Sequence, residues 1–297
     1  MPDTDSNQPG HEPVPFATVP AETVAQWEPG TFVENLAPAP DGGWFVTLPS
    51  HRRVDHVAVS GRRTTVAQLA TMPTGIVADG DGAWVTSGFI GRPGWRLDRV
   101  IPGASEHICD LPQLRFGNGM ARAGGRLLIA DSSLGIVLAV DLGSRRTATW
   151  LAHDLLTPSK GAPGIPGVNG VAVHDGQVLL TNTARTVVLR IPAAATDAAR
   201  LEIVAERLLA DDLAVAPDGT IYLATHLFDS VLRLDSAGRR TAIAGPGQGV
   251  ETSTSVAVDP ADPHVVWVTA AGERFGNVGG DKPARLIRLN VSSRETA

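Results

Sequence analysis

The stretch ENLAPAPDGGWFVT, residues 34–47, is the first of six similar segments that determine the fold. In each segment a polar residue is followed by a short apolar run, a Gly-containing turn and an apolar strand that ends in polar residues. The segments begin at Glu34, Thr74, Asn118, Asn169, Asp212 and Thr254, so they start 40, 44, 51, 43 and 42 residues apart. In the first five, the tenth residue after the start is apolar: Trp44, Trp84, Leu128, Leu179 and Tyr222. A period near 40 residues is typical of propellers and solenoids.

Two further strand patterns follow each segment. The third strand alternates apolar and polar residues, as in SVLRLDS (230–236), and the fourth runs, for example, over TATWLA (147–152). The sixth repeat ends without a fourth strand, and ETVAQWE (22–28) has the pattern of that missing strand. Such complementary ends close a ring and remove an exposed edge, whereas a solenoid needs capping ends. The sequence therefore predicts an all-β fold, a six-bladed β-propeller with four antiparallel strands per blade.

Length and composition bound the possible partners. A chain of 297 residues is normal for one closed all-β domain, and we expect a flexible tail over 1–17 and the propeller over 18–297. The net charge is −6 and no basic stripe exists, so nucleic acid is not an expected partner. The polar, Pro-rich N-terminus lacks a secretory signal pattern, and no apolar run approaches the roughly 18 residues that span a membrane. We expect a cytoplasmic protein without membrane contact, and its oligomeric state has no visible signature.

The six opening residues have a predicted place on the propeller axis. The first strand of each blade lines the central channel, so these residues should form a ring at one end of it. They also have an ordinary alternative role, capping backbone groups at turns, most of all Thr74 and Thr254. Glu34 and Asp212 would repel each other in a narrow channel unless a cation balanced them.

The donor chemistry of this ring indicates the kind of cation. Two carboxylate and two amide oxygens suit Ca²⁺, whereas a single cysteine and the absence of paired histidines disfavour structural zinc. We expect one divalent metal, most readily Ca²⁺, with Zn²⁺, Mn²⁺ or Mg²⁺ as alternatives. The expected ligands are Glu34, Asn118, Asn169 and Asp212. Asp211 remains open as an alternative to Asp212.

These residues resemble the regucalcin–gluconolactonase (senescence marker protein) family of six-bladed propellers that bind one divalent metal. The family places a Glu in the first motif, an Asn in the third, an Asn-Gly in the fourth and an Asp in the fifth. Here these positions fall on Glu34 in ENLA, Asn118 in RFGNGM, Asn169 in GVNGVAV and Asp212 in DDLAVAPDG. The resemblance covers the chain from about residue 18. The first and fifth motifs depart from the common Glu-Gly-Pro and Pro-Asp-Gly, which indicates a divergent member and weakens the transfer of a sugar-lactone substrate.

The second strands return to the ring, so their last residues and the following loops should line a pocket. Those loops include His51, Phe89, Trp95, Phe228 and Arg274, and a Pro- and Gly-rich insertion at 154–168 is either a lid or a passive loop. A surface or packing role is the alternative for each histidine. The expected catalytic residues are Asp212, His226 and Asp131, and the expected substrate contacts are Thr74, Arg115, Asn182, His51, Trp95 and Thr254.

The expected chemistry depends on a metal. Without a Gly-x-Ser-x-Gly elbow, a metal that polarises a carbonyl, with Asp212 or a bound hydroxide as base, is the preferred mechanism. The resemblance and this site together imply an enzyme, a metal-dependent lactonase-like hydrolase that opens a lactone or related cyclic ester. One alternative is a cyclase or pericyclase of specialised metabolism, for which Trp95 would suit a larger apolar substrate. Another is a non-catalytic binding propeller, which would not need Glu34 and Asp212.

Overall fold

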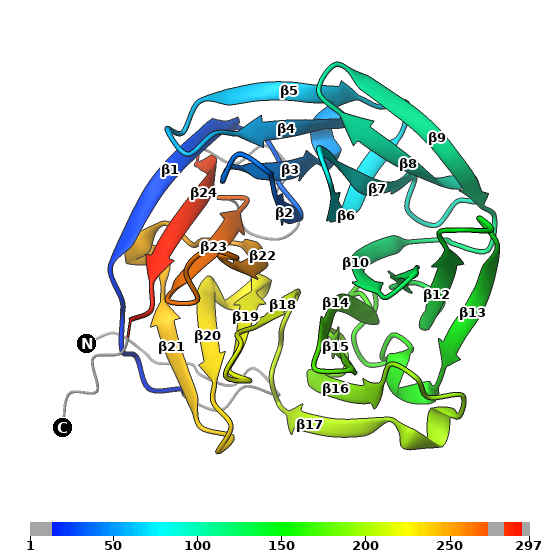
Figure 1. Cartoon of the computed structure of the whole chain (residues 1–297). Coiled ribbons are helices and arrows are strands. Elements are labelled where there is room, and N and C mark those ends of the chain that lie inside the picture. The colour runs from blue at the N-terminus through cyan, green and yellow to red at the C-terminus, as the bar shows by residue number, and fades with distance from the viewer. Residues whose placement is uncertain (1–13, 273–281, 293–297) are drawn as a thin grey trace.

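The computed structural model describes residues 14–272 and 282–292. Its strands form six antiparallel sheets of four strands, and Figure 1 shows the sheets arranged radially around one axis. This arrangement confirms the predicted six-bladed β-propeller. The remaining regular structure is five short 3₁₀ turns, and none of the helical segments in the described residues is long or apolar enough to cross a membrane.

Five blades use consecutive strands from the axis outward, and the sixth takes its outer strand from the N-terminus. The strands of the six blades are, in order, β2 (Leu36–Pro38), β3 (Trp44–Leu48), β4 (Arg53–Val57), β5 (Arg63–Gln68); β6 (Met72–Asp79), β7 (Gly82–Gly88), β8 (Trp95–Ile101), β9 (Ala104–Leu111); β10 (Gly117–Ala123), β11 (Arg126–Asp131), β12 (Ile136–Asp141), β13 (Thr147–Ala152); β14 (Val168–His174), β15 (Gln177–Asn182), β16 (Val187–Pro192), β17 (Glu202–Glu206); β18 (Leu213–Val215), β19 (Ile221–Thr225), β20 (Ser230–Leu234), β21 (Arg240–Ala244); and β22 (Ser253–Val258), β23 (Val265–Ala270), β24 (Pro283–Asn290), β1 (Ala21–Pro29). The 3₁₀ turns are η1 (Pro49–His51), η2 (Asp154–Leu156), η3 (Ala198–Arg200), η4 (His226–Phe228) and η5 (Pro246–Gln248).

The ring closes through β1, which pairs antiparallel with β24 as the pattern at 22–28 predicted. An apolar cluster fills the closing seam and contains three tryptophans, Trp27, Trp44 and Trp267. The rings of Trp44 and Trp267 lie 5.4 Å apart at 40°. Such an aromatic pair adds about 0.5–1.5 kcal/mol beyond its buried area. Closure is therefore stabilised by packing as well as by strand pairing.

Each blade is buried on both faces. Six apolar clusters lie between neighbouring blades, and successive residues of one strand belong to different clusters because side chains alternate across a sheet. In β11, for example, Leu128 faces the fourth blade, whereas Leu127 and Ile129 face the second. This two-sided burial explains why the second strands read as nearly continuous apolar runs.

The N-terminal segment reaches the fold before β1. The N–H of Ala17 donates to the carbonyl of Ala242, and the N–H of Ala242 donates to the carbonyl of Pro15, at 2.9 and 2.8 Å. Residues 15–17 of the expected tail thus lie along β21. Residues 1–13 lie outside the described residues.

Glycines in three inner strands bring neighbouring blades close to the axis. A Cβ on Gly75 would overlap the carbonyl oxygen of Asn118, and one on Gly119 would overlap that of Asn169. Gly170 is similarly pressed against the fifth blade. The Thr-Gly and Asn-Gly pairs of the repeat therefore reflect close approach of backbones, which only glycine allows. This approach holds the opening residues of adjacent blades side by side.

Candidate active site

Backbone hydrogen bonds define which residues are equivalent around the axis. The N–H of Glu34 donates to the carbonyl of Thr47 at 3.0 Å. In the fifth blade, the N–H of Asp211 makes the matching bond to the carbonyl of Ala224 at 2.8 Å. Asp211 therefore occupies the position of Glu34 in the ring, and Asp212 lies one residue further along the chain.

The prediction placed Asp212 in the ring and left Asp211 open as the alternative. The structure places Asp211 there. The prediction assumed a constant spacing between the ring residue and an apolar residue of the second strand. The second residue after the ring residue pairs with a residue of the second strand in each of blades one to five. The two paired residues are ten positions apart in blades one and five and nine apart in blades two to four, so the hairpin is one residue longer in blades one and five. The APDG sequence shared by 39–42 and 216–219 gives the correct register, because Glu34 and Asp211 each stand five residues before it.

Three carboxylates, those of Glu34, Asp211 and Asp212, influence one another at this end of the axis. Burial, reinforced by the charges of Asp211 and Asp212, holds the pKa of Glu34 well above its usual range. Burial, to which the charge of Asp211 adds, raises the pKa of Asp212 to about 7, although the hydroxyl of Ser255 donates to this carboxylate. A bound cation would offset the repulsion that adds to the effect of burial on these pKa values.

Asp211 connects the ring to a histidine. One of its carboxylate oxygens accepts a hydrogen bond from Nδ2 of Asn169, and the other lies 2.8 Å from Nδ1 of His226. His226 begins η4, the turn that follows β19, and only 8% of it is exposed. The ring of Phe32 lies 6.2 Å from the imidazole. A carboxylate that orients an imidazole in this way is the arrangement that prepares a general base.

The ring amides present oxygens that can bind a cation. Nδ2 of Asn118 donates to Ser132 Oγ at 3.2 Å, and Nδ2 of Asn169 donates to Thr183 Oγ1 at 3.1 Å, which leaves both amide oxygens as acceptors. Like the carboxylates of the ring, these amide oxygens are hard donors of the kind that Ca²⁺ prefers. Among the described residues, no three His, Cys, Asp or Glu side chains are grouped to bind a metal by themselves. The fit of a cation therefore depends on the amides as well as on Glu34.

The two threonines of the ring, Thr74 and Thr254, form hydrogen bonds within the protein. Oγ1 of Thr74 donates to the carbonyl of Gly117 in the next blade at 2.6 Å. Oγ1 of Thr254 donates to Oγ1 of Thr269 at 3.0 Å. Both side chains are buried. These bonds match the capping alternative and not the expected substrate contacts.

The structure also corrects the expected catalytic role of Asp131. Its side chain is fully buried, and its carboxylate accepts four backbone N–H groups at 2.6–3.3 Å, those of Arg115, Phe116, Ser133 and Leu134. A carboxylate that is engaged in this way stabilises loops and has no remaining access to a substrate. Asp131 instead fastens the loop after β11 to the segment before β10.

Two expected substrate contacts are occupied by the chain itself. Nδ2 of Asn182 donates to two carbonyls of the 154–168 segment at 2.8 and 3.0 Å, so it anchors that insertion. The guanidinium of Arg115 donates to the carbonyls of residues 112–114 at 2.8–3.4 Å. Their positions in the sequence predicted that these polar groups face a pocket. Each instead donates hydrogen bonds to backbone carbonyls of nearby loops.

The remaining candidates differ in exposure. Trp95 is only 1% exposed and packs between the second and third blades against Gly88 and Gly117, so its expected place at the pocket mouth is wrong. His51 lies at the surface after β3, with Nδ1 2.9 Å from Ser50 Oγ. Arg274 lies outside the described residues.

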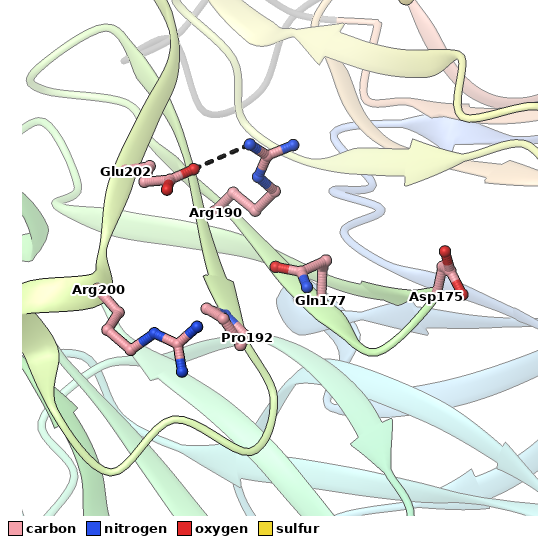
Figure 2. A pocket seen from close by; sticks show the side chains of 6 residues that line it. All are labelled: Asp175, Gln177, Arg190, Pro192, Arg200 and Glu202. Carbon is pink, nitrogen blue, oxygen red and sulfur yellow. Dashed lines mark hydrogen bonds and ion pairs between the residues drawn. The ribbon is translucent and has the colours of Figure 1, made fainter.

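A separate pocket of about 480 Å³ lies at the opposite, turn end of the fourth blade (Figure 2). Charges of both signs line it, and Arg190 and Glu202 form an ion pair of 2.9 Å. Its lining residues are Asp175, Gln177, Arg190, Pro192, Arg200 and Glu202. None of them belongs to the predicted site, so this pocket is distinct from the axial site.

Comparison with known proteins supports the fold. No protein-family profile matches the sequence, and no curated protein is significantly similar to it. Similar solved structures include the calcium-binding protein regucalcin from Agrobacterium tumefaciens (16% identity, TM-score 0.63, covering 93% of this chain and 94% of that one). They also include a gluconolactonase from Xanthomonas campestris (14%, 0.66, 96% and 98%) and a luciferin-regenerating enzyme (12%, 0.64, 92% and 95%). At these identities, the predicted resemblance is confirmed in the propeller fold, which does not by itself transfer an activity.

Proposed function

We propose that this chain is a metal-dependent lactonase-like hydrolase that opens a lactone or related cyclic ester of a small molecule. The observation that carries the proposal is the position of Asp211, whose two carboxylate oxygens face Asn169 in the ring and His226 beside it. A candidate cation site and a candidate general base thus share one residue. The regucalcin and gluconolactonase structures of similar fold favour this reaction class by analogy.

Glu34, Asn118, Asn169 and Asp211 would hold the cation, and their oxygen donors favour Ca²⁺. When bound, such an ion supplies positive charge that polarises an ester carbonyl and stabilises the oxyanion formed from it. The raised pKa values of Glu34 and Asp212 support the assignment, because carboxylates buried close together are costly until a cation offsets their charge.

The chain's own chemistry centres on His226. Asp211 accepts the Nδ1–H of His226 and so fixes the tautomer whose lone pair is on Nε2. Nε2 takes a proton from water while the water oxygen attacks the lactone carbonyl carbon. The ring C–O bond then breaks, His226 gives the proton to the departing alkoxide, and an open-chain hydroxy acid leaves. Asp211 stabilises the imidazolium between the two steps. This scheme moves the role of base from the predicted Asp212, which is bound to Ser255, to His226.

The proposal is tested by measuring the hydrolysis of δ-valerolactone through the acid that it releases in a weak buffer. We expect activity in the presence of Ca²⁺, loss of activity in a chelator and recovery when Ca²⁺ is restored. His226→Gln should lower kcat by roughly 10²–10⁴ without loss of Ca²⁺ binding, since general-base catalysis contributes about that factor. His174→Gln, at the opposite end of β14, is the matched control. Full activity of His226→Gln would exclude this base, and full activity in chelator would exclude the metal requirement. No hydrolysis with or without Ca²⁺ would favour the cyclase alternative.

A further inference from the structure

Large apolar side chains gather on loops beside the axial site. Over the second and third blades, Phe89 and Ile90 follow β7, Phe116 precedes β10 and Leu134 follows β11. These four residues are called the apolar sector below. Phe89, Ile90 and Leu134 are 37%, 51% and 45% exposed, and Phe116 is half-buried. All four lie on loops at the end of the blades where the inner strands begin.

Backbone hydrogen bonds join the apolar sector into one surface. The N–H of Gly91, next to Ile90, donates to the carbonyl of Arg115 at 2.8 Å. The N–H groups of Phe116 and Leu134 share one carboxylate oxygen of Asp131, at 3.3 and 2.9 Å. Phe116 stands two residues before the ring residue of the third blade. Through Phe116 the sector is therefore adjacent in sequence to the ring residue Asn118.

Three of the polar side chains on the loops near the axial site offer little to a substrate. The guanidinium of Arg115, the carboxylate of Asp131 and the amide of Asn182 all hold the chain's own backbone. The hydroxyl groups of a sugar lactone would lose their hydrogen bonds to water at these three side chains without gaining matching hydrogen bonds from them. An alkyl or aryl group, in contrast, would gain from covering apolar surface.

We propose that the apolar sector binds a hydrophobic substituent of the substrate, so that the preferred class is lactones with an alkyl or aryl side group and not sugar lactones. This proposal rests on the proposed hydrolase function and narrows it. Each methylene that is removed from water adds a factor of about three to four in binding. The preference should therefore grow with chain length until the sector is covered.

The test compares γ-butyrolactone with γ-hexalactone, γ-octalactone and γ-decalactone, whose ester rings are alike, and with glucono-δ-lactone. We expect kcat/KM to rise about threefold per methylene and glucono-δ-lactone to be a poor substrate. The double variant Phe89→Ser, Ile90→Ser should lower the ratio of kcat/KM for γ-decalactone to that for γ-butyrolactone by about tenfold. Val59→Ser is the matched control, since Val59 is 68% exposed at the opposite end of the first blade.

Calorimetric binding of 5-alkyl-2-pyrrolidinones, which are lactam analogues that resist hydrolysis, separates the two proposals. Affinity that rises with alkyl length in wild type but not in the double variant supports the sector even if no lactone is hydrolysed, in which case only the hydrolase proposal fails. Lactone hydrolysis that is indifferent to chain length, or fastest with glucono-δ-lactone, overturns the sector proposal and leaves the hydrolase intact. A change of oligomeric state in the double variant, measured by sedimentation, would make the sector an interface between copies and also overturn the proposal.

Discussion

Raising the pH of chelator-treated protein from 5 to 8 should destabilise the propeller, with Asp212 setting the magnitude. Burial raises the pKa of Asp212 from 3.8 to about 7, so the folded chain keeps a proton that the unfolded chain has released. A carboxyl of this kind contributes its full stability below the unfolded pKa and loses it as the pH rises through the folded pKa. Over this interval the loss is about 3 kcal/mol. Glu34, whose pKa is also raised, adds to the loss in the same direction.

Urea or thermal unfolding in EDTA at pH 5, 6, 7 and 8 measures this effect. For a chain of this size the expected fall in Tm is roughly 5–10 °C. Asp212→Asn should show a smaller fall because it removes the titrating group, whereas Asp110→Asn, whose side chain is 83% exposed, should behave like wild type. Added Ca²⁺ should restore more stability at pH 8 than at pH 5, since it binds the ionised ring. Equal stability at pH 5 and pH 8, or an undiminished fall in Asp212→Asn, would show that Asp212 does not keep a proton in the folded chain at pH 5.

Two further predictions concern how the site is held. Gly170→Ala should cost about 1–3 kcal/mol of unfolding free energy and weaken Ca²⁺ binding, because its Cβ would press on Asp212; urea unfolding and calorimetry check this, with Gly143→Ala as the control expected to be neutral. Asn182→Ala should remove the anchor of the 154–168 segment and cost about 1–3 kcal/mol. Trypsin should then cleave after Lys160 faster than in wild type, and an unchanged cleavage rate would show that Asn182 does not hold the segment.

The fold could be predicted because several local patterns agree. The repeat, the two-residue alternation and the complementary ends each require the same closed ring, and β1 pairs with β24 where ETVAQWE was expected. Glu34, Asn118 and Asn169 lie at the starts of the inner strands of their blades, as the repeat predicted. Their role as metal ligands stays a prediction. Such positions can be predicted from a repeat, because each opening residue can be aligned with the equivalent residues of the five other blades.

The site residues were harder to predict because their roles depend on contacts between distant segments. Asp212 replaced Asp211 in the prediction because hairpin lengths differ by one residue between blades, and only the APDG sequence carries the correction. Trp95 was predicted to lie at the pocket mouth because it stands at the start of a strand. Its position in the sequence does not show that its ring packs against the next blade. Asp131 and Asn182 are polar because buried backbone needs partners, which the sequence does not distinguish from contact with a substrate.

Calcium titration of chelator-treated protein by calorimetry tests whether Glu34 and Asp211 bind a cation on the propeller axis. We expect a single Ca²⁺ per chain in wild type and a loss of affinity in Asp211→Asn and in Glu34→Gln, with Asp110→Asn unchanged. Absence of Ca²⁺ binding in wild type would contradict the axial cation site. Undiminished affinity in Asp211→Asn would contradict the assignment of Asp211 as the residue that joins the cation site to His226.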